Sequence, residues 1–305
     1  METNLTLEKY PGLISTVTIG SKGEEITVGG QNALPLLFKE GNIPNPPKIA
    51  FEVWDIFPGD FDPELLNIYG EEAKDPFAWA ELGINKCKAD LICLRLQGAH
   101  PDYGDKNASK IAGFVEKFLC RIKVPLVIIG SGDDIKDNLI MPACSEAARG
   151  RRCLLGSAVQ DNYKTLVASA LADGHNIIAE SPIDVNIAKQ LNILISDMGL
   201  PLERIVIDPT IGALGYGLEY AYSIMERARL AALSGDRTLA SPFICMAGQE
   251  AWKSKEAKEI PGQGAIWEAL TATSLIQAGA DILVMRHPKA IEETKNHINI
   301  LFGGK

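Results

Sequence analysis

Short apolar runs rich in β-branched residues recur along the chain from residue 48 onward, and stretches with helical periodicity separate them. A run that is apolar on both faces is typical of a strand buried in a parallel sheet. The runs repeat about every 33 residues, close to the length of one strand–helix unit in a closed barrel of eight units. The predicted strands are residues 49–54, 91–96, 126–129, 153–158, 176–179, 205–207, 243–246 and 282–285.

Helix signals lie between these runs. Ser181-Pro-Ile-Asp184 opens one helix and Gly199-Leu-Pro201 ends it, a second helix follows Gly217, and a third starts at Pro288. The apolar positions expected to face the core are Ile187, Leu191, Leu194, Ile195 and Met198 in the first helix, Tyr220, Ile224, Ala228 and Ala231 in the second, and Ile291, Ile298, Leu301 and Phe302 in the third.

The alternation of strands and helices predicts an α/β protein with a (β/α)8 TIM barrel. An open dinucleotide-binding sheet commonly has six strands and a glycine-rich G-x-G-x-x-G turn after the first one. Here the first predicted strand is followed by Trp54-Asp-Ile-Phe-Pro-Gly-Asp60, which lacks that motif. The closed barrel is therefore favoured over the open sheet.

The N-terminal part has a different pattern. Two extended runs, residues 14–19 and 25–28, flank Gly20-Ser-Lys-Gly23, which predicts a β-hairpin. A helix-like stretch at 34–39 and a proline-rich linker at 42–47 follow. So short a hairpin is not stable alone in water. We therefore expect one TIM-barrel domain over 1–305, in which 1–47 form an N-terminal β-hairpin cap with its linker and 48–305 form the barrel.

The charge pattern excludes some partners. The net charge of −9 and the pI near 5.1 argue against nucleic acid as a partner. A membrane is also not expected, because the apolar runs are far shorter than the roughly 20 residues needed to span a bilayer. The six cysteines include no C-x-x-C pair, and residues 1–10 lack the apolar core of a signal peptide. A cytoplasmic location is the simplest expectation.

In a TIM barrel the active site is built by the loops that follow the strands. No lysine stands at a predicted strand end and no histidine-rich metal motif occurs, so a Schiff-base enzyme and a histidine metal site are not expected. His287, which precedes Pro288, is interpreted as a structural residue at a helix start. The residues at the strand ends are Asp55, Gln97, Ser131, Gln160 with Asp161 and Asn162, Glu180, Asp208, Gly248 with Gln249, and Arg286 with His287.

Two of these residues raise the question of catalysis. Glu180 and Asp208 follow adjacent predicted strands and are suited to an acid–base pair. Each carboxylate is equally suited to accept hydrogen bonds from loop backbone groups, as is Asp55. Both interpretations stay open at the level of sequence.

The segment Asp208-Pro-Thr-Ile-Gly-Ala-Leu-Gly-Tyr-Gly217 is the most unusual loop. It holds three glycines and no charge after the aspartate. Glycine lets a backbone approach a ligand closely, and a helix expected to begin near Tyr216 would add its N-terminal dipole. The loop is suited to a flat, uncharged partner surface, or it is simply a tight turn of the barrel.

Several motifs together resemble a known family. Phe51-Glu-Val-Trp-Asp55, Leu94-Arg-Leu-Gln-Gly98, residues 125–132, Asp161-Asn-Tyr-Lys164 and residues 206–217 are similar to segments of the small, or delta, subunit of the corrinoid iron–sulfur protein. That protein belongs to the acetyl-CoA decarbonylase/synthase (carbon monoxide dehydrogenase) system. The resemblance covers essentially the whole chain, and it rests on the order and spacing of the motifs.

The resemblance implies a non-catalytic barrel subunit of a methyl carrier in the reductive acetyl-CoA (Wood–Ljungdahl) pathway. A large subunit forms a heterodimer with it and carries the [4Fe–4S] cluster and the cobalamin (corrinoid), and the loop face of the barrel caps the corrinoid. The implied further partners are the methyltetrahydrofolate methyltransferase, acetyl-CoA synthase and a reductive activator. On this reading Thr210, Ile211, Gly212 and Ala213 contact the corrin, Gln160, Asn162, Gly248 and Gln249 bond its amide edge, and Asp208 belongs to the same cofactor site.

An alternative reading is a stand-alone pterin-binding TIM-barrel methyltransferase. The family's barrel is similar to those of methyltetrahydrofolate methyltransferases and dihydropteroate synthases, and Val206-Ile-Asp-Pro209 resembles an aspartate–proline turn in them. Asp55, Gln97, Asn162 and Asp208 would then read the pterin edge. The asparagine-rich first-strand motif of the synthases is missing.

Overall fold

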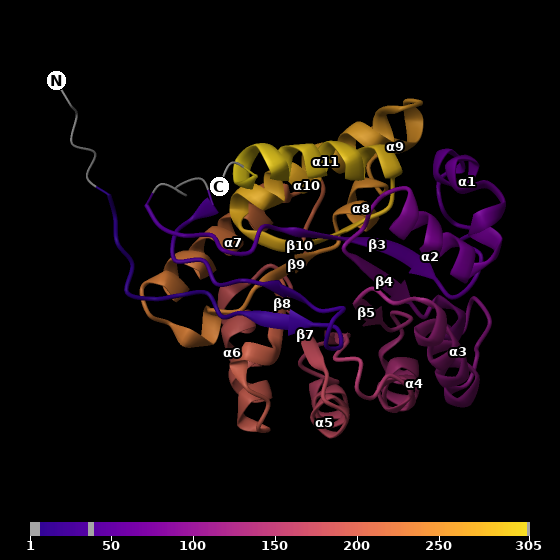
Figure 1. Ribbon diagram of the computed structural model, residues 1–305, viewed down its shortest axis with the longest axis horizontal. Coiled ribbons are helices and arrows are strands. Elements are labelled where there is room, and N and C mark those ends of the chain that lie inside the picture. Colours follow the sequence, from indigo (N-terminus) through magenta and orange to yellow (C-terminus); the bar gives the residue numbers. More distant parts are fainter. Residues whose placement is uncertain (1–6, 36–39, 304–305) are drawn as a thin grey trace.

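The computed structural model describes residues 7–35 and 40–303. Eight parallel strands form a closed barrel in the order β10-β3-β4-β5-β6-β7-β8-β9, which confirms the predicted (β/α)8 fold (Figure 1). The strands are β3 (Lys48–Trp54), β4 (Leu91–Arg95), β5 (Leu126–Ile129), β6 (Leu154–Ala158), β7 (Asn176–Glu180), β8 (Ile205–Asp208), β9 (Phe243–Cys245) and β10 (Ala280–Met285). All eight lie within the predicted runs or overlap them closely.

Helices follow the strands and form the outer layer seen in Figure 1. They are α1 (Pro63–Tyr69), α2 (Pro76–Asn85), α3 (Ala108–Arg121), α4 (Asp134–Ala147), α5 (Tyr163–Asp173), α6 (Val185–Asp197), α7 (Leu218–Leu233), α8 (Ala247–Ala251), α9 (Lys255–Glu259), α10 (Gln263–Ala278) and α11 (Pro288–Phe302). Short 3-10 turns lie at Gly70–Lys74, Gln97–Ala99, Leu202–Arg204 and Arg237–Leu239.

The core has two layers, because the side chains of a strand alternate between its faces. Phe51 and Val53 of β3 pack outward against the helices, whereas Ala50 belongs to the cluster inside the barrel. The inner cluster is closed by strands β1 (Val17–Ile19) and β2 (Ile26–Val28), which pair antiparallel. The predicted hairpin cap is therefore confirmed, and its wholly buried Val17 and Ile19 plug one end of the barrel.

Hydrogen bonds hold the hairpin in place. The Asn176 side chain at the start of β7 donates to the carbonyl of Thr18 at 2.8 Å, and Gly20 N–H donates to the carbonyl of Arg152 at 3.0 Å. Gly20 and Gly23 both have positive φ, the conformation that the predicted turn required. The helix-like stretch predicted at 34–39 lies in part outside the described residues.

The predicted buried face of α7 was wrong in one position. Tyr220 is 63% exposed, whereas Ala221, Met225, Ala228 and Ala232 are buried against the barrel. The helix begins at Leu218, after Gly217 in the left-handed region, and the predicted Ile224 and Ala228 are buried, so the error is confined to Tyr220 in its first turn. The faces predicted for α6 and α11 hold, since Leu191, Ile195, Ile291 and Ile298 are buried.

Over the described residues, no helix combines the length and apolarity that crossing a membrane requires.

Candidate functional site

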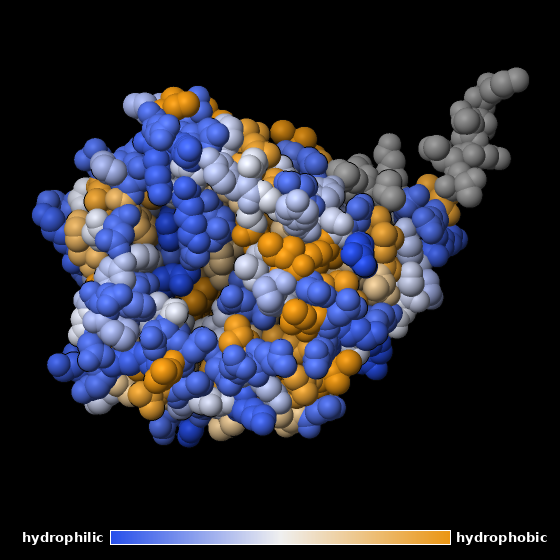
Figure 2. All heavy atoms as spheres, turned by 180° about the vertical axis from the view of Figure 1, so that it is seen from behind, coloured by the Kyte–Doolittle hydropathy of each residue, from blue (hydrophilic) through white to orange (hydrophobic). Residues whose placement is uncertain are grey.

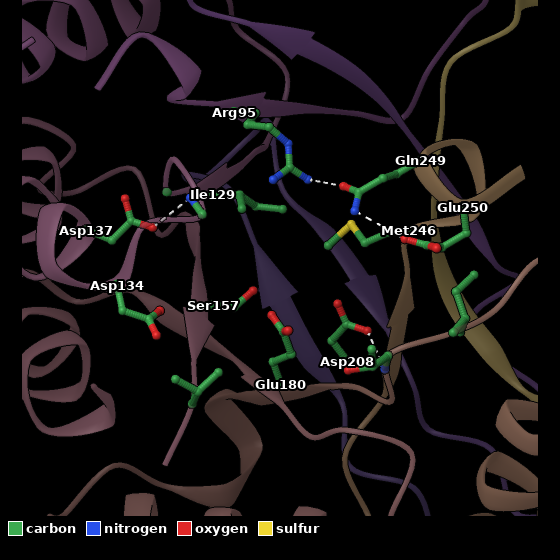
Figure 3. Close-up of a pocket in the computed structure, with 15 residues that line it drawn as sticks. Arg95, Ile129, Asp134, Asp137, Ser157, Glu180, Asp208, Met246, Gln249 and Glu250 are labelled. Carbon is green, nitrogen blue, oxygen red and sulfur yellow. Dashed lines mark hydrogen bonds between the residues drawn. The ribbon is translucent and has the colours of Figure 1, made fainter. Parts of the chain in front are cut away.

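A cavity of about 260 Å³ opens at the end of the barrel opposite the hairpin, among the loops that follow the strands (Figure 3). Its walls come from the carboxyl ends of β4 to β9. A hollow bordered mostly by hydrophilic side chains is visible left of centre in Figure 2. The cavity is lined by Arg95, Ile129, Gly130, Gly132, Asp134, Asp137, Ser157, Val159, Glu180, Asp208, Thr210, Ile211, Met246, Gln249 and Glu250.

Glu180 and Asp208 lie side by side on one wall of this cavity and point into it (Figure 3). They end β7 and β8 and are direct register partners in the parallel pair. The Asp208 side chain is buried, and its Oδ1 accepts a hydrogen bond of 2.9 Å from the N–H of Thr210. Burial and the neighbouring Glu180 carboxylate raise the pKa of Asp208 to about 8. The predicted proximity of the two carboxylates is thus confirmed.

Thr210 fixes the turn that follows Asp208. Its φ of 54° lies in the left-handed region, which a β-branched residue rarely adopts. The Thr210 hydroxyl donates to the carbonyl of Ser181 at 3.0 Å and so ties the loop after β8 to the loop after β7. Strained backbone of this kind persists where the surrounding structure enforces it, often at functional sites. The turn holds Asp208 in one orientation against the cavity.

The raised pKa of Asp208 predicts a pH-dependent stability difference for Asp208→Asn. The folded protein holds the Asp208 proton more tightly than the unfolded chain, so this carboxyl costs stability progressively as the pH rises from the unfolded pKa near 4 to the folded value of about 8. Besides burial, the charged neighbours that set the pKa of Asp208 are Glu180, Glu250 and Arg95. Asparagine keeps the acceptor for Thr210 N–H. Above pH 8 the free energy of unfolding of Asp208→Asn should therefore exceed that of the wild type by at least about 1 kcal/mol.

Denaturant unfolding at about pH 4 and at about pH 8.5 measures this difference. The variant and the wild type should be nearly equal at the lower pH, where the carboxyl is largely protonated in the folded state and its pKa costs no stability. A difference of the same size at both pH values would show that Asp208 does not titrate between them.

Four of the residues predicted for the corrinoid site line the cavity: Asp208, Thr210, Ile211 and Gln249. The Gln249 side chain accepts a hydrogen bond of 2.6 Å from Nη2 of Arg95. Figure 3 shows this bond spanning the cavity on the side away from the two carboxylates.

The other predicted residues do not line this cavity. Gly212 and Ala213 lie within their loop, where a Cβ on Gly212 would come within 2.4 Å of the Tyr216 carbonyl oxygen. Asn162 is buried, and its amide bonds Val159 N–H at 2.9 Å and the Ser157 carbonyl at 3.2 Å.

Gly248 faces β10, and a Cβ there would come within 2.9 Å of the backbone nitrogen of Arg286, while Gln160 is exposed. The contact of these residues with a corrin stays a prediction.

The uncharged loop after Asp208 does not make an uncharged site. Residues 209–217 carry no charge, but Asp134, Glu180, Asp208 and Glu250, from the ends of neighbouring strands and the segments after them, line the same cavity. The loop could be read from its own sequence, whereas the acidic wall combines residues from separate strand ends. The floor of the site is polar and mainly acidic.

Sequence reasoning missed Arg95 and Glu52. Arg95 is the last residue of β4, and its Nε donates to Oε1 of Glu52, which lies wholly buried inside the barrel, at 3.1 Å. Both residues interrupt otherwise apolar strands, and a buried charge in such a strand requires a partner. A charged residue within an apolar strand was therefore the sequence signal that could have revealed this pair.

Two other strand-end residues are structural. The Asp55 carboxylate pairs with Lys106 at 2.9 Å and accepts from Gly98 N–H at 2.6 Å. His287 caps α11, with its Nδ1 accepting from Lys289 N–H at 3.0 Å, which confirms the structural interpretation of this residue.

Comparison with solved structures shows the fold that this chain shares. Dihydropteroate synthase from Stenotrophomonas maltophilia superposes with a TM-score of 0.59 at 14% identity, covering 93% of this chain and 96% of that one. The enzyme from Vibrio fischeri gives a TM-score of 0.60 at 10% identity, covering 94% and 97%. At such identities the likeness extends to the barrel alone.

Sequence relatives are much closer. Subunit delta of the acetyl-CoA decarbonylase/synthase complex from Methanothermobacter thermautotrophicus is 36% identical over 299 residues, covering 95% of this chain and 76% of the relative. The corresponding subunit from Methanocaldococcus jannaschii is 34% identical over 306 residues, covering 95% and 74%. The model of the family described as CO dehydrogenase/acetyl-CoA synthase delta subunit matches residues 16–296. By this match and these identities, the chain belongs to the CO dehydrogenase/acetyl-CoA synthase delta subunit family.

Proposed function

We propose that this chain is the barrel subunit of a corrinoid iron–sulfur protein, a methyl carrier that serves acetyl-CoA synthase. In this proposal the loop end of the barrel covers a corrinoid held by a large subunit, and the chain itself is not catalytic. The family match over residues 16–296 supports the assignment to the acetyl-CoA synthase system. The relatives are subunits of the acetyl-CoA decarbonylase/synthase complex. The observation that carries the role of the loop end is a set of exposed apolar side chains on the segments that follow the barrel strands.

We name this set the apolar rim. Ile135 and Leu139, one turn apart at the start of α4, are 78% and 65% exposed, and Asp134 beside them lines the cavity. Exposed apolar groups of this kind mark surfaces that bind a partner. The rim residues come from the first turns of α4 and from the loops after four other strands, and they comprise Phe57, Tyr103, Ile135, Leu139, Ile183 and Tyr216.

The rim suits a corrinoid better than the cavity does. A corrin is a broad, flat macrocycle with apolar faces and amide groups along its edge, and a cavity of about 260 Å³ is too small to enclose it. The rim offers apolar contacts for a face, and the exposed Gln160 and the cavity-lining Gln249 offer amides for the edge. When bound, the corrinoid supplies the cobalt that carries the methyl group. The chain contributes a cover that keeps water away from it.

The proposal places the [4Fe–4S] cluster on the large subunit. Burial raises the pKa of the Cys153 thiol to about 12 and that of Cys87 to about 11, so these side chains are not ready thiolate ligands. Over the described ranges 7–35 and 40–303, no cluster of histidine, cysteine and acidic residues is arranged to hold a metal ion. The methyltetrahydrofolate methyltransferase, acetyl-CoA synthase and a reductive activator are the further proposed partners.

A double substitution in the rim tests the proposal. Ile135→Asp with Leu139→Asp puts two charges where the partner is proposed to dock, and it should weaken binding to the corrinoid-loaded large subunit more than about tenfold, the effect of losing a hot spot. The matched control is Ile300→Asp, at an 81% exposed position near the C-terminal end of α11. The affinities of the wild-type chain, the double variant and the control for the corrinoid-loaded large subunit are then measured and compared. Equal affinity for all of them would refute docking at this rim.

The carboxylate pair favours a second candidate, a barrel that itself binds a pterin. Glu180 and Asp208 face the cavity together, and two neighbouring carboxyl groups can bond the amino and ring N–H groups of such a heterocycle. Solved barrels of similar fold include a dihydropteroate synthase in complex with pteroic acid, from Coxiella burnetii. Titration of the chain with methyltetrahydrofolate separates the candidates, because saturable binding that is lost in Asp208→Ala would favour this second one.

A further inference from the structure

A second cavity, of about 510 Å³, lies in the other half of the barrel mouth. Arg95 and Gln249 line both cavities, so their 2.6 Å hydrogen bond forms a bridge between the two halves (Figure 3). The first cavity lies over β4 to β9, and the second over the ends of β3, β4 and β10 with α8 and α9. Its lining residues are Trp54, Asp60, Phe61, Asp62, Pro63, Arg95, Gln97, Tyr103, Gln249, Trp252, Lys253, Lys258 and Arg286.

Two arginines of this cavity share one buried carboxylate. Arg286 donates from Nε and Nη2 to Glu52 at 2.8 and 3.0 Å, and Arg95 donates from Nε to the same group at 3.1 Å. Burial alone would raise the pKa of Glu52, but the two guanidinium groups lower it to about 2, so the group is charged. Two positive charges against one negative leave a surplus at the cavity, where Arg286 is only 7% exposed.

The guanidinium groups keep hydrogen-bonding capacity. Arg95 uses Nε and Nη2, and Arg286 uses the same two atoms, whereas Nη1 of each finds no acceptor among residues 7–35 and 40–303. Guanidinium forks bind carboxylate and phosphate oxygens by paired N–H groups. The two guanidinium groups therefore combine a local positive surplus with unused donors.

The other charged residues around the cavity largely balance one another. Lys258 adds a positive charge at its rim, whereas Lys253 is paired with Glu250 at 2.7 Å. Asp62 caps α1 by accepting from Glu64 N–H at 2.9 Å, and Asp60 accepts from the Tyr103 hydroxyl. The positive surplus is therefore local to the two guanidinium groups.

Aromatic rings form much of the remaining wall. Trp54 and Phe61 meet edge to face with ring centroids 4.9 Å apart, and Arg286 stacks over Phe61 at 4.1 Å. The ring of Trp54 is fixed by its indole N–H, which donates to Glu52 at 2.8 Å, and that of Trp252 by a 2.6 Å bond to Glu268. Rings held in this way offer fixed surfaces against which another planar ring can pack.

We propose that this second cavity is a binding site for a planar ring that carries an oxyanion, either a carboxylate or a phosphate. The oxyanion lies against the unused donors of Arg95 and Arg286, and the ring packs among Trp54, Phe61 and Trp252. The site needs neither the corrinoid nor the large subunit, although Tyr103 and Gln249 belong both to its lining and to the proposed corrinoid cover.

Ligand-observed NMR on the full chain, without any partner, tests the site with small probes. Benzoate and phenyl phosphate present the two oxyanions, and benzamide is the neutral control of the same shape. At least one of the two anions should bind about tenfold more tightly than benzamide, because a hydrogen bond to a charged group is stronger than one to a neutral group. If benzoate binds more tightly than phenyl phosphate, the natural ligand carries a carboxylate, and in the opposite case it carries a phosphate. Equal binding of benzamide and both anions, or binding of none, would overturn the proposal.

Two substitutions should act in opposite directions. Glu52→Gln removes the competing carboxylate and should tighten benzoate or phenyl phosphate binding about tenfold, whereas Arg95→Gln should weaken it by a similar factor. Arg149→Gln, which removes a guanidinium 61% exposed beside Asp173, is the matched control and should change nothing. A loss of binding in both Glu52→Gln and Arg95→Gln would show that the network serves structure alone.

A second pair of variants keeps the test decisive if the buried substitutions disturb folding. Lys253 lies in the turn after α8 and Lys258 in α9, and both side chains are exposed. Lys253→Gln with Lys258→Gln should weaken anion binding several-fold without affecting benzamide, as expected for rim charges. Unchanged anion affinity in that double variant and in Arg95→Gln would overturn the proposal.

Discussion

Asp281→Ala is expected to lower the free energy of unfolding by about 3–5 kcal/mol, the cost of leaving a buried charge without its partner. Asp281 lies at the start of β10, where it is 1% exposed and pairs with Arg229 of α7, itself 3% exposed. The same carboxylate accepts from Phe243 N–H of β9 at 2.7 Å and from the Gln31 side chain. Its removal leaves the Arg229 guanidinium without its charged partner. It also removes the contacts by which Asp281 holds the N-terminal segment, α7 and β9 to β10.

Equilibrium denaturation of Asp281→Ala and Glu203→Ala measures the contrast. The Arg237–Glu203 pair is a suitable control because its side chains are 79% and 51% exposed, and such pairs contribute about 0–1 kcal/mol. Similar losses in the two variants would mean that Asp281 is not the tie between these elements.

Gly212→Val is expected to destabilise the protein by about 1–3 kcal/mol and to displace the loop after β8. A Cβ at this position would come within 2.4 Å of the Tyr216 carbonyl oxygen and 3.1 Å of the Gly217 carbonyl carbon. Both are backbone atoms, so no side-chain rotation relieves the contact. Tyr216 belongs to the apolar rim, and a displaced rim should weaken association with the large subunit and shorten the lifetime of Co(I) in the complex.

Gly113→Val provides the control, since Gly113 lies in α3 and nothing stands within 4 Å of the position that a Cβ would take there. It should leave partner affinity and the Co(I) lifetime unchanged. An unaltered Co(I) lifetime in Gly212→Val would argue against a role of this loop in covering the corrinoid.

The barrel could be predicted because its signals are local. Each strand of a parallel barrel is buried on both faces, so Leu126–Ile129 and Ile205–Asp208 appear in the sequence as apolar runs without reference to their neighbours. The register of α7 could not be read in the same way. Tyr220 is apolar enough to fit the helical period, and only the contact of the barrel with Ala221 and Met225 decides which stripe turns inward.

The candidate site was predictable only where neighbouring strands bring residues together. Glu180 and Asp208 end consecutive parallel strands, and consecutive strands of a barrel lie next to each other, so their contact followed from the order of the chain. Glu52 and Arg95 also lie on consecutive strands, β3 and β4, but Arg286 follows the last strand, β10, and reaches Glu52 only because the sheet closes. The Arg95–Gln249 bridge joins the end of β4 to the segment after β9 and is likewise a product of closure.

We propose that this family member covers a corrinoid on a large partner subunit. Co-expression of the chain with that subunit, followed by size-exclusion chromatography with cobalt analysis of the purified complex, tests it most directly. We predict one complex containing both polypeptides in equal amounts together with cobalt. A chain that elutes alone beside its partner, or a joint complex without cobalt, would rule out this role.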